Sequence, residues 1–198
     1  PRPLRPRPQA CRQGRNDPMT PQDLLHAAAE SRSDDPARPL LIAAAIAAVT
    51  GRQVVLVGGS AVNLHTGSYR PTDIDLVAHL TPADHQALED LGLTREGRHY
   101  HYDTPGGPIL VEFPDDQLHP LLTTPPELIE VAPGVIARAV ALDDLMIDRA
   151  LQATDGTPVT FDEALRLAVA AYRRINWDDL TRRATVAGQG PPARAIEM

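Results

Sequence analysis

The segment that most constrains the fold is residues 54–77, VVLVGGSAVNLHTGSYRPTDIDLV. A β-branched apolar run at residues 53–57 predicts a buried strand. The Gly58-Gly59 pair that follows predicts a tight turn into a short helix at residues 60–65. Alternating polar and apolar residues then predict a second strand at residues 73–79. A strand, a turn, a helix and a strand in so short a segment indicate a sheet with helices packed against it.

The second strand carries two acidic residues that are expected to share a face. Asp73 and Asp75 are two positions apart, so their carboxylates point to one side of the sheet while Ile74 points to the other. Carboxylate oxygens at this spacing suit Mg²⁺ or Mn²⁺, which prefer oxygen ligands and commonly share them with substrate phosphates. The pair therefore predicts a metal site on this strand.

Glu112 is expected to complete that site from a neighbouring strand. In the run ILVEF at residues 109–113, alternate apolar residues share one face, which leaves Glu112 with Leu110 on the other. Two further acids follow closely, so a merely solvated Glu112 is the alternative. With two ions held by three carboxylates, one ion lowers the pKa of an attacking hydroxyl and the other stabilises a leaving phosphate. Glu112 or Asp73 can also act as the base.

The Gly-Gly-Ser segment has the residues needed to hold a triphosphate. Gly58 and Gly59 let the backbone approach phosphate oxygens, the helix N-terminus that follows offers N–H donors, and Ser60 adds a hydroxyl. Alone, the glycine pair is better explained as a strand-to-helix turn, and Asp-x-Asp is common on exposed strand faces. Their occurrence together in this order favours a site for a metal and a triphosphate.

The spacing of apolar residues, together with residues that typically start or end helices, predicts the other helices and strands. A Thr-Pro-x-Asp start signal occurs at Thr20 and again at Thr81. Helices are expected at residues 21–30, 37–50 (ended by Gly51), between Thr81 and Gly92, and at 142–153, 160–174 and 177–187. Strands are expected at residues 93–102 and 109–113, joined by a loop at 103–107, and as a pair around Pro133-Gly134. The expected fold class is α/β (α+β): a small mixed β-sheet flanked by helices, with a C-terminal helical extension.

The order of these motifs resembles a known signature. Gly-Gly-Ser, twelve residues and then Asp-x-Asp resemble the polymerase-β-type nucleotidyltransferase superfamily. Gly-Gly-Ser-Ala on the helix and Arg70-x-Thr72-Asp73 on the strand are similar to its AbiEii/AbiGii-type branch, which includes bacterial toxins of toxin–antitoxin and phage-defence systems. The resemblance implies a nucleotidyltransferase core at residues 19–145 and a C-terminal helical region at 146–190.

The resemblance also implies roles for individual residues. Gly58, Gly59 and Ser60 would bind the triphosphate, and Asp73 and Asp75 would bind the metal ions. Thr72 would contact the nucleotide, and Arg70 would contact a phosphate or flank the aspartate pair.

The chain departs from the branch in its later helices. Toxin relatives often carry a lysine in a segment like LDDLMIDRALQA, where this chain has Arg149. Arginine binds phosphate in a bidentate manner rather than as a point charge, so Arg149 is a candidate nucleotide contact. A lysine–aspartate pair typical of the branch is not evident, although Asp162 in TFDEALRL is a candidate remnant.

Two functions follow from these patterns. The first is a metal-dependent nucleotidyltransferase that moves a nucleoside monophosphate from an NTP to a hydroxyl of RNA, such as tRNA, or of a protein. It would act as a toxin with a cognate antitoxin as partner. The alternative is a catalytically weak nucleotide-binding regulator or an antitoxin-type interaction module, which the missing lysines and the acidic body favour.

Composition limits the setting in which either function would operate. The chain has a net charge of −7 and no lysine, so bulk electrostatics do not favour broad nucleic-acid binding. No apolar stretch approaches the roughly 20 residues needed to cross a bilayer. A single cysteine, Cys11, fits a reducing compartment, and we expect a cytoplasmic protein. Residues 1–18, rich in proline and arginine, are expected to form a disordered leader ahead of Met19, and residues 191–198 a disordered tail.

Overall fold

The computed structural model describes residues 19–67, 69–154 and 158–186. Its helices are α1 (Pro21–Glu30), α2 (Ala37–Thr50), α3 (Gly58–Thr66), α4 (Pro82–Asp90), α5 (Leu142–Thr154), α6 (Pro158–Ala171) and α7 (Trp177–Val186). Its strands are β1 (Val55–Leu56), β2 (Ile74–Val77), β3 (Thr94–Glu96), β4 (His99–Tyr102), β5 (Ile109–Glu112), β6 (Glu127–Ala132) and β7 (Val135–Ala139). The leader expected at residues 1–18 and the tail expected at 191–198 lie outside the described residues.

The strands form one mixed sheet in the order β3-β4-β5-β2-β1-β7-β6. β2 is antiparallel to β1 and parallel to β5, whereas β1 is parallel to β7. The predicted class, a mixed sheet flanked by helices, is confirmed. Because β2 lies at the centre of the sheet, Asp75 on this strand has a neighbouring strand on each side.

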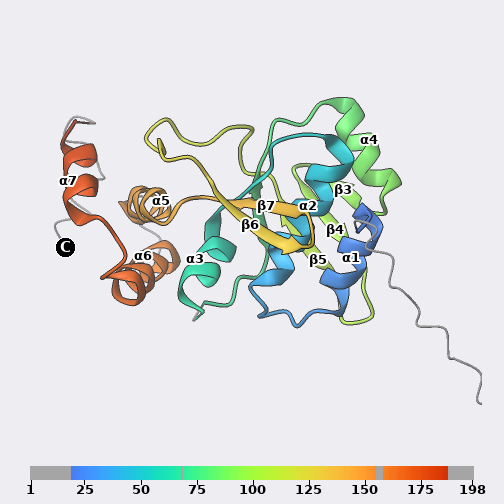
Figure 1. Cartoon of the computed structure of the whole chain (residues 1–198), viewed down its shortest axis with the longest axis horizontal. Helices are drawn as coiled ribbons and strands as arrows, with labels where there is room; N and C mark the ends of the chain where they lie inside the picture. The colour runs from blue at the N-terminus through green and yellow to red at the C-terminus, as the bar shows by residue number, and fades with distance from the viewer. Residues whose placement is uncertain (1–18, 68, 155–157, 187–198) are drawn as a thin grey trace, which may run out of the picture.

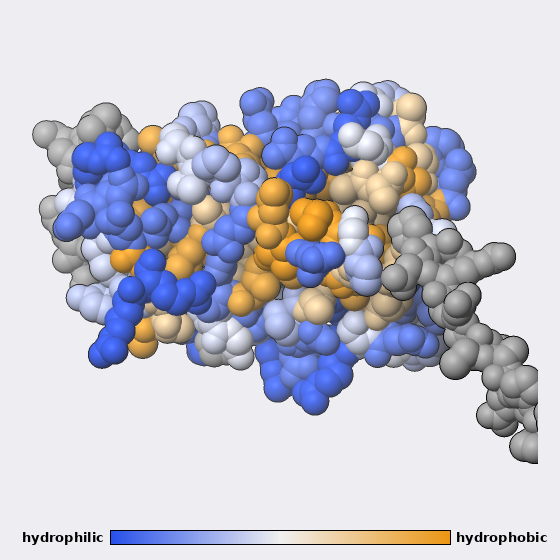
Figure 2. Space-filling view, in the orientation of Figure 1, coloured by the Kyte–Doolittle hydropathy of each residue, from blue (hydrophilic) through white to orange (hydrophobic). Residues whose placement is uncertain are grey.

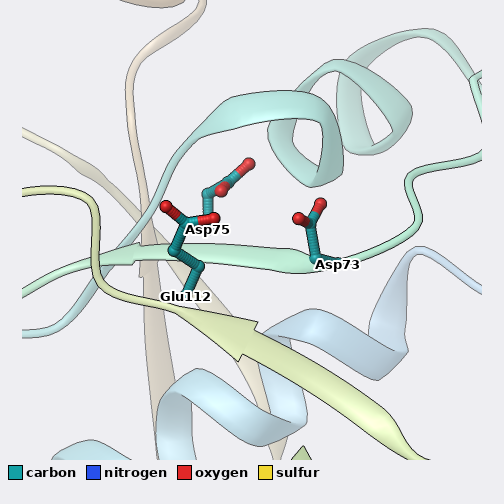
Figure 3. A group of neighbouring side chains, drawn as sticks. All are labelled: Asp73, Asp75 and Glu112. Carbon is teal, nitrogen blue, oxygen red and sulfur yellow. The ribbon is translucent and has the colours of Figure 1, made fainter. Parts of the chain in front are cut away.

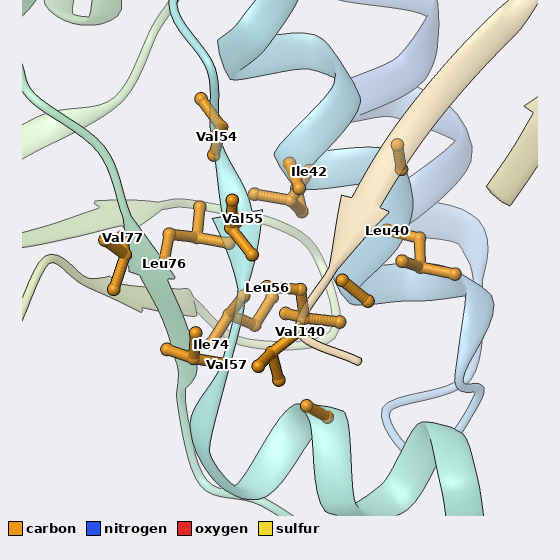
Figure 4. Close-up of a cluster of buried hydrophobic side chains, with 14 of the residues drawn as sticks. Leu40, Ile42, Val54, Val55, Leu56, Val57, Ile74, Leu76, Val77 and Val140 are labelled. Atoms are coloured by element: carbon orange, nitrogen blue, oxygen red, sulfur yellow. The ribbon is translucent and has the colours of Figure 1, made fainter. Parts of the chain in front are cut away.

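The core lies where α2 packs against the central strands (Figure 4). The apolar run predicted as a buried strand is buried throughout, from Val54 to Val57. Leu40 and Ile42 of α2 lie among these side chains. The middle of α2, from Pro39 to Ile46, is buried on every side because the helix contacts α1 and α4 as well as the sheet. Burial of this apolar surface fixes the strands that carry the acidic residues.

The predicted start signals are observed as capping boxes. The hydroxyls of Thr20 and Thr81 accept from the backbone N–H groups of Asp23 and Asp84, and these aspartates accept from the threonine N–H groups in return. A cap of this kind contributes about 1 kcal/mol to a helix. Gly51 ends α2 in the left-handed conformation at φ 68°, as its position predicts.

Helices gather at the two ends of the molecule (Figure 1). α1, α2 and α4 lie at one end, and α5, α6 and α7 at the other. α3 contacts β2 on one side and α5 and α6 on the other. The helix that follows the glycine pair therefore connects the sheet to the C-terminal helices. The division expected at residue 145 falls within α5 and stays a prediction.

Several sequence expectations need correction. The strand expected at residues 73–79 extends only over Ile74–Val77, so Asp73 lies just before it. Residues 93–102 are not one strand but two, β3 and β4, because the chain turns at Gly97, which has φ 65°. The hairpin of β4 and β5 around the 103–107 loop is confirmed. The strand expected at residues 53–57 pairs only at Val55–Leu56, and α3 begins at Gly58 rather than at Ser60. The glycines therefore form the first turn of the helix instead of a separate turn before it.

Apolar residues gather near the middle of one face, over β6 and β7, with polar residues around them (Figure 2). Leu128 of β6 and Ile136 of β7 are among the exposed apolar side chains. None of the helices in the described part of the chain is long and apolar enough to span a membrane.

Candidate active site

Three carboxylates converge at the centre of the sheet: Asp73, Asp75 and Glu112 (Figure 3). Asp73 immediately precedes β2, Asp75 lies on β2, and Glu112 ends β5. β2 and β5 run parallel with Asp75 directly beside Glu112, so both side chains leave the same face of the sheet. One carboxylate oxygen from each residue lies within 4.8 Å of the others. The sequence predicted this grouping, and the structure brings the three residues together.

The surroundings of Asp75 raise the pKa of its carboxyl group. Burial is the largest cause and the charges of Asp73 and Glu112 add to it, so that the pKa rises from 3.8 to about 6. The charge of Arg149 and the backbone N–H of Gly59 act in the opposite direction. Like charges held this close disfavour ionisation unless a cation neutralises them.

The residues of the cluster fit a divalent metal ion. Hard cations such as Mg²⁺ take carboxylate oxygens as ligands and leave positions for water and phosphate. Among the described residues, Asp73, Asp75 and Glu112 are the only group of three or more acids, histidines or cysteines close enough to hold an ion. His99 and His101 of β4 belong to no such group.

Gly58 is required at its position by the Asp75 side chain. It has φ 62°, a conformation that favours glycine. A Cβ atom added there would lie 1.9 Å from the Oδ2 atom of Asp75, much closer than atoms approach. The first glycine of the pair therefore makes room for the Asp75 carboxylate.

Gly59 and Ser60 are engaged within the protein. The Gly59 N–H donates to the Asp75 carboxylate. The Ser60 hydroxyl donates to the main-chain oxygen of Asp73 over 3.0 Å, and this side chain is only 1% exposed. Both groups were predicted as phosphate donors. In this arrangement they hold the two aspartates in place, and phosphate binding by them stays a prediction.

Glu112 has two basic neighbours on β4 and the turn before it. The guanidinium of Arg98 lies 2.8 Å from one carboxylate oxygen, and the His99 ring lies 3.7 Å from the other. His99 is opposite Glu112 in the β4–β5 register, which explains the contact. Arg98 is largely exposed, so this ion pair contributes less than about 1 kcal/mol. Arg98 was not identified from the sequence, because the turn at Gly97 was missed.

Arg149 lies at the same site, within an ion-pair network that sequence reasoning did not find. It is 5% exposed, and its Nη1 atom donates to Glu163 Oε2 over 2.6 Å. Its Nη2 atom donates to Asp148 Oδ2, also over 2.6 Å. Glu163 comes from α6 and is itself 5% exposed. An acid within the apolar run of α6 is the one sequence signal that could have indicated this partner.

Tyr69 connects this network to the glycine pair. Burial raises the pKa of the Tyr69 hydroxyl, and its hydrogen bond with Glu163 adds to the rise. A Cβ atom on Gly59 would lie 2.6 Å from the Tyr69 ring and 3.4 Å from Glu163. The second glycine is therefore needed for the close approach of α6 and Tyr69 to α3.

The other residues that the sequence predicted for the site lie at the protein surface. Arg70 is exposed, with its Nη2 atom 3.5 Å from Asp34, and so it does not flank Asp73 as an ion-pair partner. Thr72 is exposed beside Asp73. Asp162, the candidate remnant of a lysine–aspartate pair, forms a surface ion pair with Arg166 on α6. Its neighbour Glu163 is the acid that faces the site.

A cavity of about 560 Å³ opens beside Asp75 and Glu112. Gly58 lines it, together with Asp148, Arg149 and Gln152 of α5. The segment between β5 and β6, from Pro114 to Leu122, also contributes to its lining. The cavity has the size and mixed polarity of a small-molecule site.

Comparisons with known proteins bear on the fold. The sequence matches no protein-family model and no curated protein. Among solved structures, the chain is similar to an antigenic nucleotidyltransferase-like protein from Paracoccidioides brasiliensis, with a TM-score of 0.52 and 15% identity over 83% of this chain and 93% of that chain. It also matches the antibiotic-resistance factor ANT(2'')-Ia, with a TM-score of 0.42 and 16% identity over 82% of this chain and 89% of that chain. The chain thus has the fold of a nucleotidyltransferase-like protein, as the motif order predicts.

Proposed function

We propose that this protein is a metal-dependent nucleotidyltransferase that moves a nucleoside monophosphate from an NTP to a hydroxyl group. The observation that carries the proposal is the convergence of Asp73, Asp75 and Glu112 from two parallel strands, with carboxylate oxygens within 4.8 Å of one another. Nucleotidyl transfer depends mainly on neutralising the triphosphate and aligning the reacting groups. A nucleotidyltransferase-like fold with three convergent carboxylates supports both requirements.

The residues of the chain have distinct parts in this reaction. Mg²⁺ or Mn²⁺, when bound, would neutralise the phosphates and lower the pKa of the attacking hydroxyl. Asp73, Asp75 and Glu112 would hold the ions, and Gly58 leaves space for the Asp75 carboxylate. Glu112 or Asp73 would accept the proton of the acceptor hydroxyl.

Arg149 lines the same cavity as Asp75 and Glu112 and would contact the nucleotide there. Asp148 and Glu163 fix its guanidinium plane, and three of its five N–H groups are used in those bonds. The remaining N–H groups are available to a phosphate oxygen. A fixed arginine of this kind is preorganised for phosphate.

We further propose that the acceptor is RNA, such as tRNA, or a protein hydroxyl, and that the protein acts in the cytoplasm as a toxin with a cognate antitoxin. Support for this part comes from the likeness of the Gly-Gly-Ser-Ala and Arg-x-Thr-Asp-Ile-Asp motifs to the AbiEii/AbiGii-type branch.

Transfer of label is the direct test of the proposed reaction. The protein would be incubated with each α-³²P-labelled NTP, Mg²⁺ and either total tRNA or a cell lysate. We expect label on an RNA or a protein with the wild type, and at least a hundredfold less with Asp73→Asn or Asp75→Asn. Asp90→Asn on α4, which removes an exposed acid bonded to Gln86, is the matched control and should match the wild type. Equal labelling by all four proteins would refute the proposal.

A second function remains open because of one observation: Arg149 is already paired with two carboxylates. A nucleotide-binding regulator would use the same site without turnover. Calorimetry with a non-hydrolysable NTP analogue distinguishes the two. Tight, Mg²⁺-dependent binding with no product from any acceptor would favour the regulator, whereas metal-dependent product would exclude it.

A further inference from the structure

A second, smaller cavity of about 170 Å³ lies at the opposite end of the acidic cluster. The 560 Å³ cavity borders Asp75 and Glu112, whereas this one borders Asp73. Its walls come from the start of α2, from α3, from the segment before β2 and from the β4–β5 loop. The residues used below are Arg38, Asp35, Ser60, Asn63, Thr72 and Asp73.

Arg38 brings an unpaired positive charge to this cavity. Its Nε atom is buried and has no hydrogen-bond partner. In the described part of the chain, the other buried side-chain nitrogens without a partner belong to Arg183, which has Asp144 and Asp179 beside it. Arg38 forms no ion pair with any described residue, and burial lowers its pKa with no carboxylate to oppose the effect. A buried charged donor without an acceptor is costly, so an anion at this position would be stabilised.

The other polar groups around Arg38 are mostly occupied. The Asp35 carboxylate accepts from the Ala37 N–H over 2.9 Å, and the Asn63 amide donates to the main-chain oxygen of Asp34 over 3.3 Å. Ser60 donates to the main-chain oxygen of Asp73. The Thr72 hydroxyl makes no hydrogen bond to any described residue and is exposed at the rim. Arg38 and Thr72 are therefore the donors that a ligand in this cavity would meet.

We propose that this cavity binds a phosphate group, held by the guanidinium of Arg38 and the hydroxyl of Thr72. Arginine presents several N–H donors in one plane, which matches the oxygens of a phosphate. Asp35 and Asp73 both border the cavity, so an anion alone would meet carboxylates of the same sign. Asp73, with Asp75 and Glu112, would hold a divalent ion, whose charge would offset part of that repulsion. Binding of phosphate at Arg38 is therefore coupled to binding of metal at the acidic cluster.

This inference rests on the proposed function, because the phosphate belongs to one of the substrates of transfer. Two substrates carry one: the NTP, through its terminal phosphates, and a nucleic-acid acceptor, through its backbone or 5′ end. In an in-line displacement the acceptor and the leaving pyrophosphate lie on opposite sides of the reacting phosphorus. Two cavities at opposite ends of one row of carboxylates fit that requirement.

Calorimetric titrations with three probes test the proposal in the presence of Mg²⁺. The probes are inorganic tripolyphosphate, a short RNA with a 5′-phosphate and the same RNA with a 5′-hydroxyl. The variants are Arg38→Gln, Arg38→Lys and Thr72→Val, with Arg182→Gln as control because Arg182 is an exposed arginine on α7. Thermal unfolding of each free variant checks the fold, and Arg38→Gln should be at least as stable as the wild type because it removes an unsatisfied donor.

We expect Arg38→Gln to weaken tripolyphosphate binding at least tenfold, Arg38→Lys to restore part of it, Thr72→Val to weaken it severalfold, and Arg182→Gln to leave it unchanged. The same losses on the 5′-phosphorylated RNA, but not on its 5′-hydroxyl form, would support the proposal and assign the phosphate to the acceptor. Unchanged affinity of Arg38→Gln for all probes would overturn it. If Asp73→Asn still abolishes Mg²⁺-dependent NTP binding in that case, the proposed function stands without this site. If Asp73→Asn also binds NTP normally, the proposed function fails instead.

Discussion

Two charged groups meet at the candidate active site, and the protein holds them in opposite ways. Asp73, Asp75 and Glu112 form a cluster of one sign, in which burial and like charge raise the pKa of Asp75 to about 6. Asp148, Arg149 and Glu163 alternate in sign, and their contacts of 2.6 Å neutralise most of the charge. A bound cation would relieve the repulsion within the first group. The second group has partners of opposite charge within the protein.

The difference indicates that the acidic cluster is suited to bind a cation, whereas the paired network holds the Arg149 side chain in position. Repulsion among carboxylates held this close destabilises the folded protein, and a bound metal ion would offset that repulsion. A paired network in the protein interior makes little net contribution to stability but becomes costly when one partner is lost. Arg149 belongs to both, because its charge also lowers the pKa of Asp75. Substitutions on the two sides should therefore have opposite effects on the metal-free protein.

The largest effect is expected from breaking the paired network. Glu163→Ala leaves the guanidinium of Arg149, which is 6% exposed, with Asp148 alone. Removing one partner of a buried pair costs roughly 3–5 kcal/mol. Urea unfolding should show a loss of this size. The double variant Arg149→Met/Glu163→Met should recover much of it, since apolar residues can replace a buried pair. A double variant no more stable than the single one would contradict the pairing.

On the acidic side, Asp75→Asn should stabilise the metal-free protein at neutral pH. Because the folded pKa of Asp75 is about 6 and the unfolded value is 3.8, ionisation above pH 6 opposes folding by roughly 3 kcal/mol at most. The cost is fully present above about pH 6 and disappears as the pH falls below 4. Unfolding free energies in EDTA should therefore favour Asp75→Asn at pH 7.5 and converge with the wild type at pH 4. A variant that is less stable at pH 7.5 would show that the cluster is not under repulsion.

Gly58→Ala tests whether the backbone makes room for the acidic cluster. Gly58 and Gly97 have nearly the same φ, 62° and 65°, but a Cβ atom meets Asp75 only at Gly58. The cost of the left-handed conformation, about 1–2 kcal/mol, applies to both. We expect Gly58→Ala to lose at least 1 kcal/mol more than Gly97→Ala in urea unfolding and to bind Mn²⁺ at least tenfold more weakly. Equal losses and equal metal affinity would mean that Asp75 can move aside.

The smallest effect is expected at the surface pair of α6. Asp162 and Arg166 are about half exposed and four residues apart. Such pairs contribute about 0.3–0.5 kcal/mol. Asp162→Asn should change the unfolding free energy by no more than this and leave NTP binding intact. A large effect on NTP binding would indicate that Asp162, rather than Glu163, is the acid of α6 that acts at the nucleotide site.

The sequence predicted the acidic cluster because its signals are local. Alternation on β2 and β5 determines which side chains share a face, and only the pairing of the two strands had to be inferred. The Arg149–Glu163 pair could not be predicted in this way. It depends on how α5 packs against α6, and helix packing has no local signature for an individual side chain. Arg98 was missed because the turn at Gly97 was taken as the middle of a strand.

Metal binding by the purified protein tests the central claim most directly. Mn²⁺ binding would be measured by electron paramagnetic resonance, with Mg²⁺ as competitor, for the wild type, Asp73→Asn, Asp75→Asn and the control Asp90→Asn. The proposal predicts Mn²⁺ binding by the wild type and the control, displacement by Mg²⁺, and a loss of at least tenfold in affinity in the other two variants. Binding of equal affinity in all four proteins, or none in the wild type with or without NTP, would contradict a metal site at Asp73, Asp75 and Glu112.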